Sequence, residues 1–170
     1  MDFKTYIRDI PDFPKDGVVF KDITTLLKDA KALKMTSEAL CQMVGDQKVD
    51  KVVSMESRGF FFAPILGVHF NAGFVPVRKK GRLPAKTVGQ TYNLEYGTDT
   101  LEIHADAISP GERVLIHDDV LATGGTALAV CQMIESMGAQ VVQCNFLLEL
   151  GFLEGRKKLE GFKVKSLISY

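Results

Sequence analysis

The chain has 170 residues, of which 46% are hydrophobic and 25% are charged, which is typical of a folded globular protein and argues against intrinsic disorder. Its 21 basic and 21 acidic side chains cancel, so the composition indicates no bulk attraction to nucleic acid. No apolar run is long enough to span a membrane, and the start does not resemble a secretion signal. The three cysteines lack metal-ligand spacing, which predicts reduced thiols in a cytoplasmic protein.

Short strands and helices alternate along what we interpret as a single domain covering residues 1–170. Apolar residues three and four positions apart predict helices over 31–46, 59–70 and 124–137, the second of them kinked or started late by Pro64. Apolar runs predict strands over 51–55, 74–77, 113–118, 141–148 and 163–170. Such alternation predicts an α/β fold, with a mostly parallel twisted sheet covered by helices on both faces. Residues 11–28 and 79–103 interrupt the alternation, and segments of this kind often carry substrate contacts.

The strongest motif runs from Val114 to Thr126, where an apolar strand ends in Asp118 and Asp119 and turns into a helix. Open α/β sheets bind ligands at the carboxyl ends of their strands, where adjacent carboxylates can accept hydrogen bonds from sugar hydroxyls. The following loop offers backbone N–H groups, two glycines and two hydroxyls at a helix start, a combination that binds phosphate. Its members are Ala122, Thr123, Gly124, Gly125 and Thr126. The competing interpretation is an incidental acidic, glycine-rich turn.

A second junction between strand and helix lies at Ser54–Gly59. Arg58 would place a planar, permanently charged guanidinium beside backbone amides, which suits the oxygens of a pyrophosphate group. Alone, the stretch favours an ordinary helix start capped by Ser57. Beside the first motif, the pyrophosphate interpretation is preferred, because a ligand with two phosphate ends needs two anion sites.

The run from Val114 to Thr126 closely resembles the phosphoribosyl pyrophosphate (PRPP) signature of type I phosphoribosyltransferases. The resemblance implies the type I phosphoribosyltransferase fold, with Asp118 and Asp119 on the ribose 2- and 3-hydroxyls and the loop 122–126 on the 5-phosphate. It also implies that the loop at Ser54–Gly59 binds pyrophosphate through a cis peptide bond between Glu56 and Ser57. His117 stands where the family usually has an apolar residue, and we expect it to face away from the ligand.

Three further segments, residues 13–23, 56–60 and 91–97, resemble the adenine-specific branch of this family. The resemblance implies an N-terminal base-binding hood over residues 11–28. The resemblance further implies that in this hood the backbone of Val19 recognises adenine, Phe20 stacks on the base and Lys21 contacts its edge. An extended backbone also presents N–H and C=O groups side by side, which match the N1 acceptor and 6-amino donor of adenine. A hydrophobic strand packed on the core is the competing interpretation.

Residues 79–103 are interpreted as a flexible catalytic lid loop. A basic run is usually a solvated surface, but Arg78 and Lys79 directly follow a predicted strand, and we expect both to contact pyrophosphate. The resemblance implies that Arg78 reaches the active site of a neighbouring subunit in a homodimer. It further implies that Glu95 handles the proton of adenine, with Tyr96 beside it.

The activity that the resemblance implies is Mg²⁺-dependent transfer of the 5-phosphoribosyl group from PRPP to N9 of adenine, giving AMP and pyrophosphate in purine salvage. No protein side chain is expected to be a dedicated metal ligand, because Mg²⁺ would be held mainly through PRPP and water. Two alternatives stay open: a PRPP-sensing regulator without catalysis, and a phosphoribosyltransferase for another purine base. Val19 and Lys21 are the positions that decide between bases.

Overall fold

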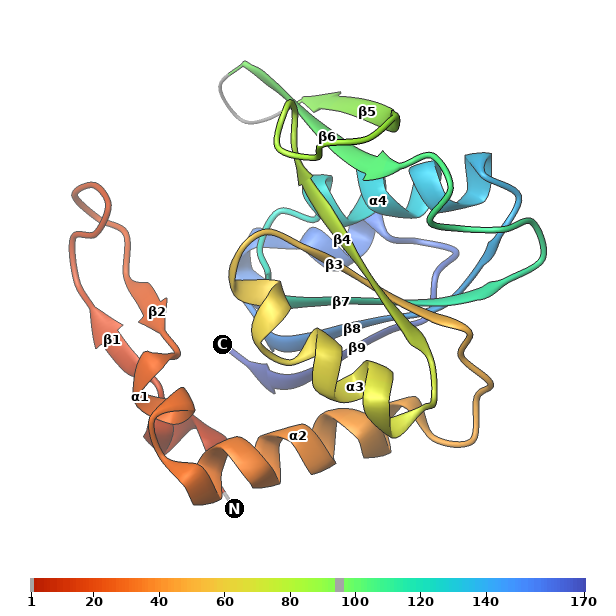
Figure 1. Ribbon diagram of the computed structural model, residues 1–170. Helices are drawn as coiled ribbons and strands as arrows, with labels where there is room; N and C mark the ends of the chain where they lie inside the picture. Colours follow the sequence, from red (N-terminus) through yellow and green to blue (C-terminus); the bar gives the residue numbers. More distant parts are fainter. Residues whose placement is uncertain (1, 94–96) are drawn as a thin grey trace. The chain divides into compact units, whose positions relative to one another are not determined.

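The computed structural model of the chain describes residues 2–93 and 97–170, which form an N-terminal unit ending at Ala39 and a larger unit from Leu40 to Tyr170. In the N-terminal unit an antiparallel pair of strands is followed by helices (Figure 1). The elements are η1 (Phe3–Tyr6), β1 (Arg8–Ile10), β2 (Phe20–Asp22), α1 (Thr24–Leu27) and α2 (Ala30–Val44), the last of which continues into the larger unit.

Asp22 ties the elements of the N-terminal unit together. Its carboxylate accepts hydrogen bonds from the Thr24 backbone N–H at 2.9 Å and from Arg8 Nε at 3.0 Å. These two contacts, the Thr24 bond first, lower the pKa of Asp22 to about 2. The carboxylate therefore stays ionised at neutral pH, where it fixes the start of α1 against the β1–β2 pair.

A seven-stranded sheet forms the centre of the larger unit within the described residues. The strands are β3 (Lys51–Met55), β4 (Gly73–Lys79), β5 (Thr87–Asn93), β6 (Thr98–His104), β7 (Arg113–Leu121), β8 (Gln140–Glu149) and β9 (Val164–Ser169). Their order across the sheet is β5-β6-β4-β3-β7-β8-β9, and the five strands from β4 to β9 in that order are parallel. Strand β6 pairs antiparallel with both β4 and β5, so a hairpin forms one edge.

Helices cover both faces of this sheet. The helical elements are η2 (Arg58–Phe61), α3 (Ala63–His69), α4 (Gly125–Ser136), η3 (Gly151–Leu153) and α5 (Gly155–Lys158). Helix α3 packs on β3 and β4, whereas α4 packs on β5, β7 and β8, and the two lie on opposite sides of the strands in Figure 1. Val53, Ile116 and Phe146 of the central strands are fully buried, as expected for parallel strands covered on both faces.

The predicted α/β fold, with its mostly parallel sheet and helices on both faces, is confirmed. One expectation about an element needs correction. The segment 79–103 is not irregular, because it contains the β5–β6 hairpin, in which buried Leu101 and Ile103 alternate with more exposed residues. The apolar segment 59–70, whose helix Pro64 was expected to kink or to start late, is divided into η2 and α3, since Pro64 lacks an N–H and fits the first turn of a new helix.

The strand order places a topological switch point between β3 and β7. These two strands are parallel neighbours, with Ser54 opposite His117, and the chain continues from β3 to β4 on one side and from β7 to β8 on the other. Ligands of open α/β sheets bind in the crevice at the carboxyl ends of such strands. Both sequence motifs follow these two strands, and the fold therefore brings them to one edge. None of the helices in the described ranges has the length and apolar character that crossing a membrane requires.

Candidate active site

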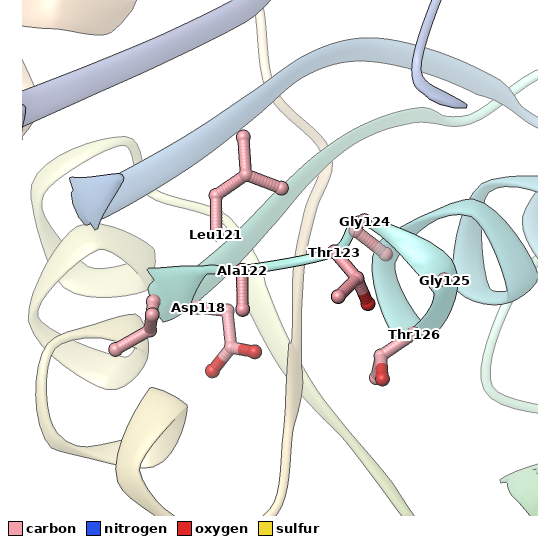
Figure 2. A pocket seen from close by; sticks show the side chains of 9 residues that line it. Asp118, Leu121, Ala122, Thr123, Gly124, Gly125 and Thr126 are labelled. Atoms are coloured by element: carbon pink, nitrogen blue, oxygen red, sulfur yellow. The ribbon is translucent and has the colours of Figure 1, made fainter. Parts of the chain in front are cut away.

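The loop between β7 and α4 lines a cleft of about 80 Å³. Figure 2 shows Asp118, Thr123 and Thr126 presenting their oxygen atoms on the same side of this loop, whereas Leu121 points to the other side. The lining residues are Asp118, Val120, Leu121, Ala122, Thr123, Gly124, Gly125, Thr126 and Ala127. Helix α4 begins at Gly125, so its first backbone N–H groups and its positive dipole end lie beside the cleft. These groups can bind an anion.

Gly124 permits this loop to form. Its φ angle is +79°, a left-handed conformation that side chains rarely adopt, and an added Cβ would lie 2.3 Å from the carbonyl oxygen of Gly155. Both constraints require glycine at the start of α4. The glycines of the motif therefore shape the backbone as well as leaving space for a ligand.

Asp118 lines the cleft near the carboxyl end of β7, and Asp119 follows it in the strand. Asp119 is 4% exposed and its Oδ2 lies 2.8 Å from Nε of Arg58, so the two predicted anion loops are joined by an ion pair. Burial raises the pKa of Asp118 well above its usual range, and the neighbouring Asp119 carboxylate adds to the effect. Burial also raises the pKa of Asp119, although Arg58 opposes this. Hydrogen-bond donors placed beside the two carboxylates would therefore stabilise their ionised forms.

Gly59 allows the two loops to approach each other. An added Cβ at this position would lie 2.4 Å from Oγ of Ser54 and 2.6 Å from Oδ1 of Asp118. Such distances are far inside van der Waals contact, so only glycine keeps the Asp118 carboxylate where the structure has it.

Glu56 anchors the basic residues at the end of β4. Its carboxylate accepts a hydrogen bond from Arg78 Nε at 2.6 Å and lies 3.3 Å from Nη1 of Arg82. The Glu56–Ser57 peptide bond is cis, as the resemblance implied. Arg78 therefore pairs inside its own chain, and its reach to a neighbouring subunit stays a prediction. Lys79 pairs with Asp99 at 3.3 Å.

Tyr92 of the β5–β6 hairpin contacts the phosphate loop, an arrangement that the sequence analysis did not anticipate. Oγ1 of Thr126 donates a hydrogen bond to the Tyr92 hydroxyl at 3.4 Å. A tyrosine in a polar stretch carries no signal for such a contact, because it depends on how the hairpin packs against α4. The hairpin is thus connected to the cleft through a hydroxyl that could also face a ligand.

The structure brings together Arg58, Asp118, Asp119 and the loop 122–126, as the sequence predicted. Glu95 and Tyr96 lie outside the described residues, so their predicted roles are not addressed. The hood residues lie in the N-terminal unit, where Val19 is 48% exposed, the Phe20 ring packs against the Phe13 ring, and Lys21 Nζ pairs with Asp9 at 2.8 Å. Their base-binding roles stay predictions.

His117 faces away from the cleft, as expected. The side chain is fully buried, its Nδ1 lies 3.3 Å from Oδ1 of Asn145, and its ring packs edge-on against Phe62. Burial lowers the pKa of His117 to about 4. The imidazole is therefore neutral at physiological pH and acts as a packing residue.

Comparisons with known proteins agree with this site. The model of the phosphoribosyl transferase domain matches residues 22–166, so the fold and the site define a phosphoribosyltransferase. An adenine phosphoribosyltransferase of Christiangramia forsetii is 57% identical over 170 residues, covering 100% of this chain and 99% of the relative. The chain belongs to the adenine phosphoribosyltransferase family.

Solved structures lead to the same family. The crystal structure of adenine phosphoribosyltransferase from Thermoanaerobacter pseudethanolicus matches with a TM-score of 0.97 at 52% identity, covering 99% of this chain and 98% of that one. The enzyme from Saccharomyces cerevisiae, complexed with adenine and an imino-altritol bisphosphate, matches with a TM-score of 0.92 at 38% identity, covering 98% and 96%.

Proposed function

We propose that the chain transfers the 5-phosphoribosyl group of PRPP to N9 of adenine, forming AMP and pyrophosphate in purine salvage. The observation that carries the proposal is the pairing of two anion-binding loops across the β3–β7 switch point, joined by the Arg58–Asp119 ion pair. A substrate with a phosphate at one end, a pyrophosphate at the other and sugar hydroxyls between them fits that arrangement. Adenine as the acceptor follows from the family to which the chain belongs.

In this proposal the β7–α4 loop holds the ribose phosphate. The backbone N–H groups of 122–126 and the hydroxyls of Thr123 and Thr126 donate to the 5-phosphate. Asp118 and Asp119 accept hydrogen bonds from the ribose 2- and 3-hydroxyls, which is favourable because buried carboxylates lack water as a donor. The sugar is thereby held with its C1 toward the β3 loop, and positioning of this kind accounts for a large part of the acceleration.

The leaving pyrophosphate is assigned to the β3 side. Arg58 donates from the loop itself, and Arg78 and Lys79 add positive charge from the end of β4, where Glu56 orients Arg78. Charge develops on the leaving oxygens as the glycosidic bond breaks, and fixed cations stabilise it without reorganisation.

Mg²⁺ fits the donor set of this cleft. The described residues contain no group of three or more His, Cys, Asp or Glu side chains that could hold a metal, but Mg²⁺ commonly uses one or two carboxylates together with substrate phosphates and water. Asp118 and Asp119 would contact such an ion indirectly, through water, with PRPP and water as its main ligands. When bound, Mg²⁺ would neutralise negative charge on the pyrophosphate.

The remaining roles belong to the hood and the lid. Val19, Phe20 and Lys21 would select and stack the adenine, and Glu95 would accept or relay the adenine proton, with Tyr96 beside it. Closure of the 79–103 segment, including its hairpin, would exclude water that could hydrolyse PRPP. A cytoplasmic location is part of the proposal, favoured by three buried cysteines that form no disulfide within the described residues.

The test is formation of pyrophosphate and AMP by the purified protein with PRPP and Mg²⁺, using adenine, guanine, hypoxanthine and xanthine in separate reactions. We expect turnover with adenine alone. Turnover with a different base would keep the reaction and refute the assignment of adenine. PRPP binding without turnover on any base would favour a regulator that senses PRPP.

A homodimer is also proposed, and an exposed apolar strip supports it. Phe61, Ile65 and Val68, at positions i, i+4 and i+7 across η2 and α3, are 46%, 39% and 85% exposed. An apolar strip at helical spacing is costly in water and typical of an interface, and a second copy of the chain can bury it symmetrically.

Replacing Val68 with aspartate is expected to shift the protein from dimer to monomer, because the charge would be buried in the interface. Analytical ultracentrifugation measures the shift. Phe152→Asp is the matched control, since Phe152 is 73% exposed and lies on η3, which is not part of this strip. If Arg78 serves the neighbouring subunit, the Val68→Asp monomer also loses kcat/KM. A wild-type monomer, or a variant that stays dimeric, would contradict the proposed interface.

A further inference from the structure

The phosphate loop is backed by a second loop that does not line the cleft. An added Cβ at Gly155 would lie 2.0 Å from the carbonyl oxygen of Ala122 and 2.9 Å from the backbone nitrogen of Gly124. Gly155 is absent from the residues that line the cleft, so it supports the loop from outside. Two backbone segments in such close contact cannot shift independently. The position of Gly155 therefore constrains the loop that carries the phosphate-binding amides.

The position of Gly155 is in turn fixed by its neighbour Arg156, whose guanidinium forms a bidentate ion pair with the Glu149 carboxylate. Nε of Arg156 donates to Oε1 of Glu149 at 3.0 Å, and Nη2 donates to Oε2. Nη1 of Arg156 donates to the Val164 carbonyl at 2.8 Å, and Oγ of Ser166 donates to Glu149 at 2.9 Å. A bidentate pair of this kind fixes direction as well as distance, so α5 is held against β8 and β9.

Glu149 also connects to the phosphate loop through the sheet. It is the register partner of Leu121, the last residue of β7, and the next N–H, of Leu150, donates to the Leu121 carbonyl at 2.9 Å. The Arg156 guanidinium lowers the pKa of Glu149, which keeps the carboxylate ionised. The Glu149–Arg156 pair thus reaches the loop from two directions, through the strand at Leu121 and through Gly155 behind Ala122.

We propose that Glu149 and Arg156 are positioning residues for the 5-phosphate of PRPP. Their ion pair holds Gly155 against the back of residues 122–124 and thereby keeps the loop amides aimed into the cleft. Donors that are fixed before binding hold an anion more tightly than donors that must first be ordered. Neither side chain lines the cleft, so the effect passes through the backbone. The inference rests on the proposed function, because it takes PRPP as the ligand.

The test compares PRPP binding in variants of this pair, measured by titration calorimetry with Mg²⁺. Arg156→Lys keeps the positive charge but loses the bidentate hydrogen bonds to Glu149. Glu149→Gln keeps the shape of the side chain but loses its negative charge. We expect the Kd for PRPP to rise at least about tenfold in both, since a displaced loop loses its alignment with the phosphate. Lys157→Ala is the control, because this neighbouring side chain is 74% exposed. It should bind PRPP as the wild type does.

Kinetics separate positioning from a general loss of structure. We expect the KM for adenine and the kcat at saturating PRPP to stay within about threefold of wild type, because the contacts to the base and the leaving group are untouched. Gly155→Ala should lose more PRPP affinity than the variants of the ion pair, because its added methyl overlaps the backbone of the phosphate loop. Arg156→Lys tests the contact between Gly155 and that loop without such an overlap. Unchanged PRPP affinity in folded Arg156→Lys, or parallel losses in kcat and both KM values, would overturn the inference. A wild type that makes no AMP refutes the proposed function instead, and the PRPP affinities still decide the inference.

Discussion

Gly59→Ala is expected to lower kcat/KM for PRPP by about 100-fold or more, because a shift of about 1 Å in a positioning group can cost that much. The added methyl would lie 2.6 Å from Oδ1 of Asp118 and 2.4 Å from Oγ of Ser54. Ser54 is fully buried, so it has little room to move, and the Asp118 carboxylate must turn away from the cleft. Steady-state kinetics with varied PRPP, together with calorimetric binding of PRPP, measures the effect.

Gly73→Ala is the matched control for this variant. Gly73 starts β4, at the opposite end from Lys79, and an added Cβ would meet only the flexible side chain of Lys51, at 3.2 Å. Activity near that of the wild type is expected. If Gly59→Ala binds PRPP with normal affinity and turns over normally, the close approach of the β3 and β7 loops has no role in the site.

The sequence predicted the central sheet well because its parallel strands carry strong local signals. Strand β3 was predicted with the bounds that the structure has, since the buried Val52, Val53 and Met55 make the segment largely apolar. The strand expected over 113–118 continues to Leu121, because the chain stays paired with β8 through the two acidic residues. A carboxylate usually marks the end of a buried strand, and here the cleft and Arg58 accommodate it instead.

The hairpin and the supports behind the site were harder to predict because they depend on contacts between distant segments. In strand β6, buried residues alternate with half-buried ones. Polar side chains and nearby glycines obscured this alternation in the sequence. Gly155 follows Gly124 by a whole helix and strand in the sequence and approaches its backbone only in the fold. A single glycine in a polar stretch indicates a turn, and nothing local indicates that another loop packs on it.

Asp118→Asn and Asp119→Asn are both expected to weaken PRPP binding, and they are expected to change the stability of the folded protein by different amounts. Burial and the adjacent carboxylate raise the pKa of Asp118, so the folded state favours its protonated form. The ionisation of Asp118 therefore destabilises the fold as the pH rises above the pKa of the unfolded chain, which is about 4. The Asp118→Asn substitution would remove this destabilisation, and the midpoint of thermal unfolding should rise at pH 7. The difference from wild type should disappear below about pH 4, where both states are protonated.

Asp119→Asn should raise the unfolding midpoint less than Asp118→Asn does, because burial raises the pKa of Asp119 while the Arg58 cation opposes this rise. The substitution also removes the carboxylate that lies 2.8 Å from Nε of Arg58 and leaves that cation with less compensation. The double variant should bind PRPP at least about 100-fold more weakly than wild type, since two charge-assisted hydrogen bonds to ribose are each worth about 1.5–3 kcal/mol. Unchanged PRPP affinity in the double variant would remove the ribose assignment. A carboxylate that destabilises the folded protein, and whose replacement abolishes PRPP binding, is retained for the ligand. Measuring both the unfolding midpoint and the PRPP affinity of Asp118→Asn therefore distinguishes a ligand-binding carboxylate from a structural one.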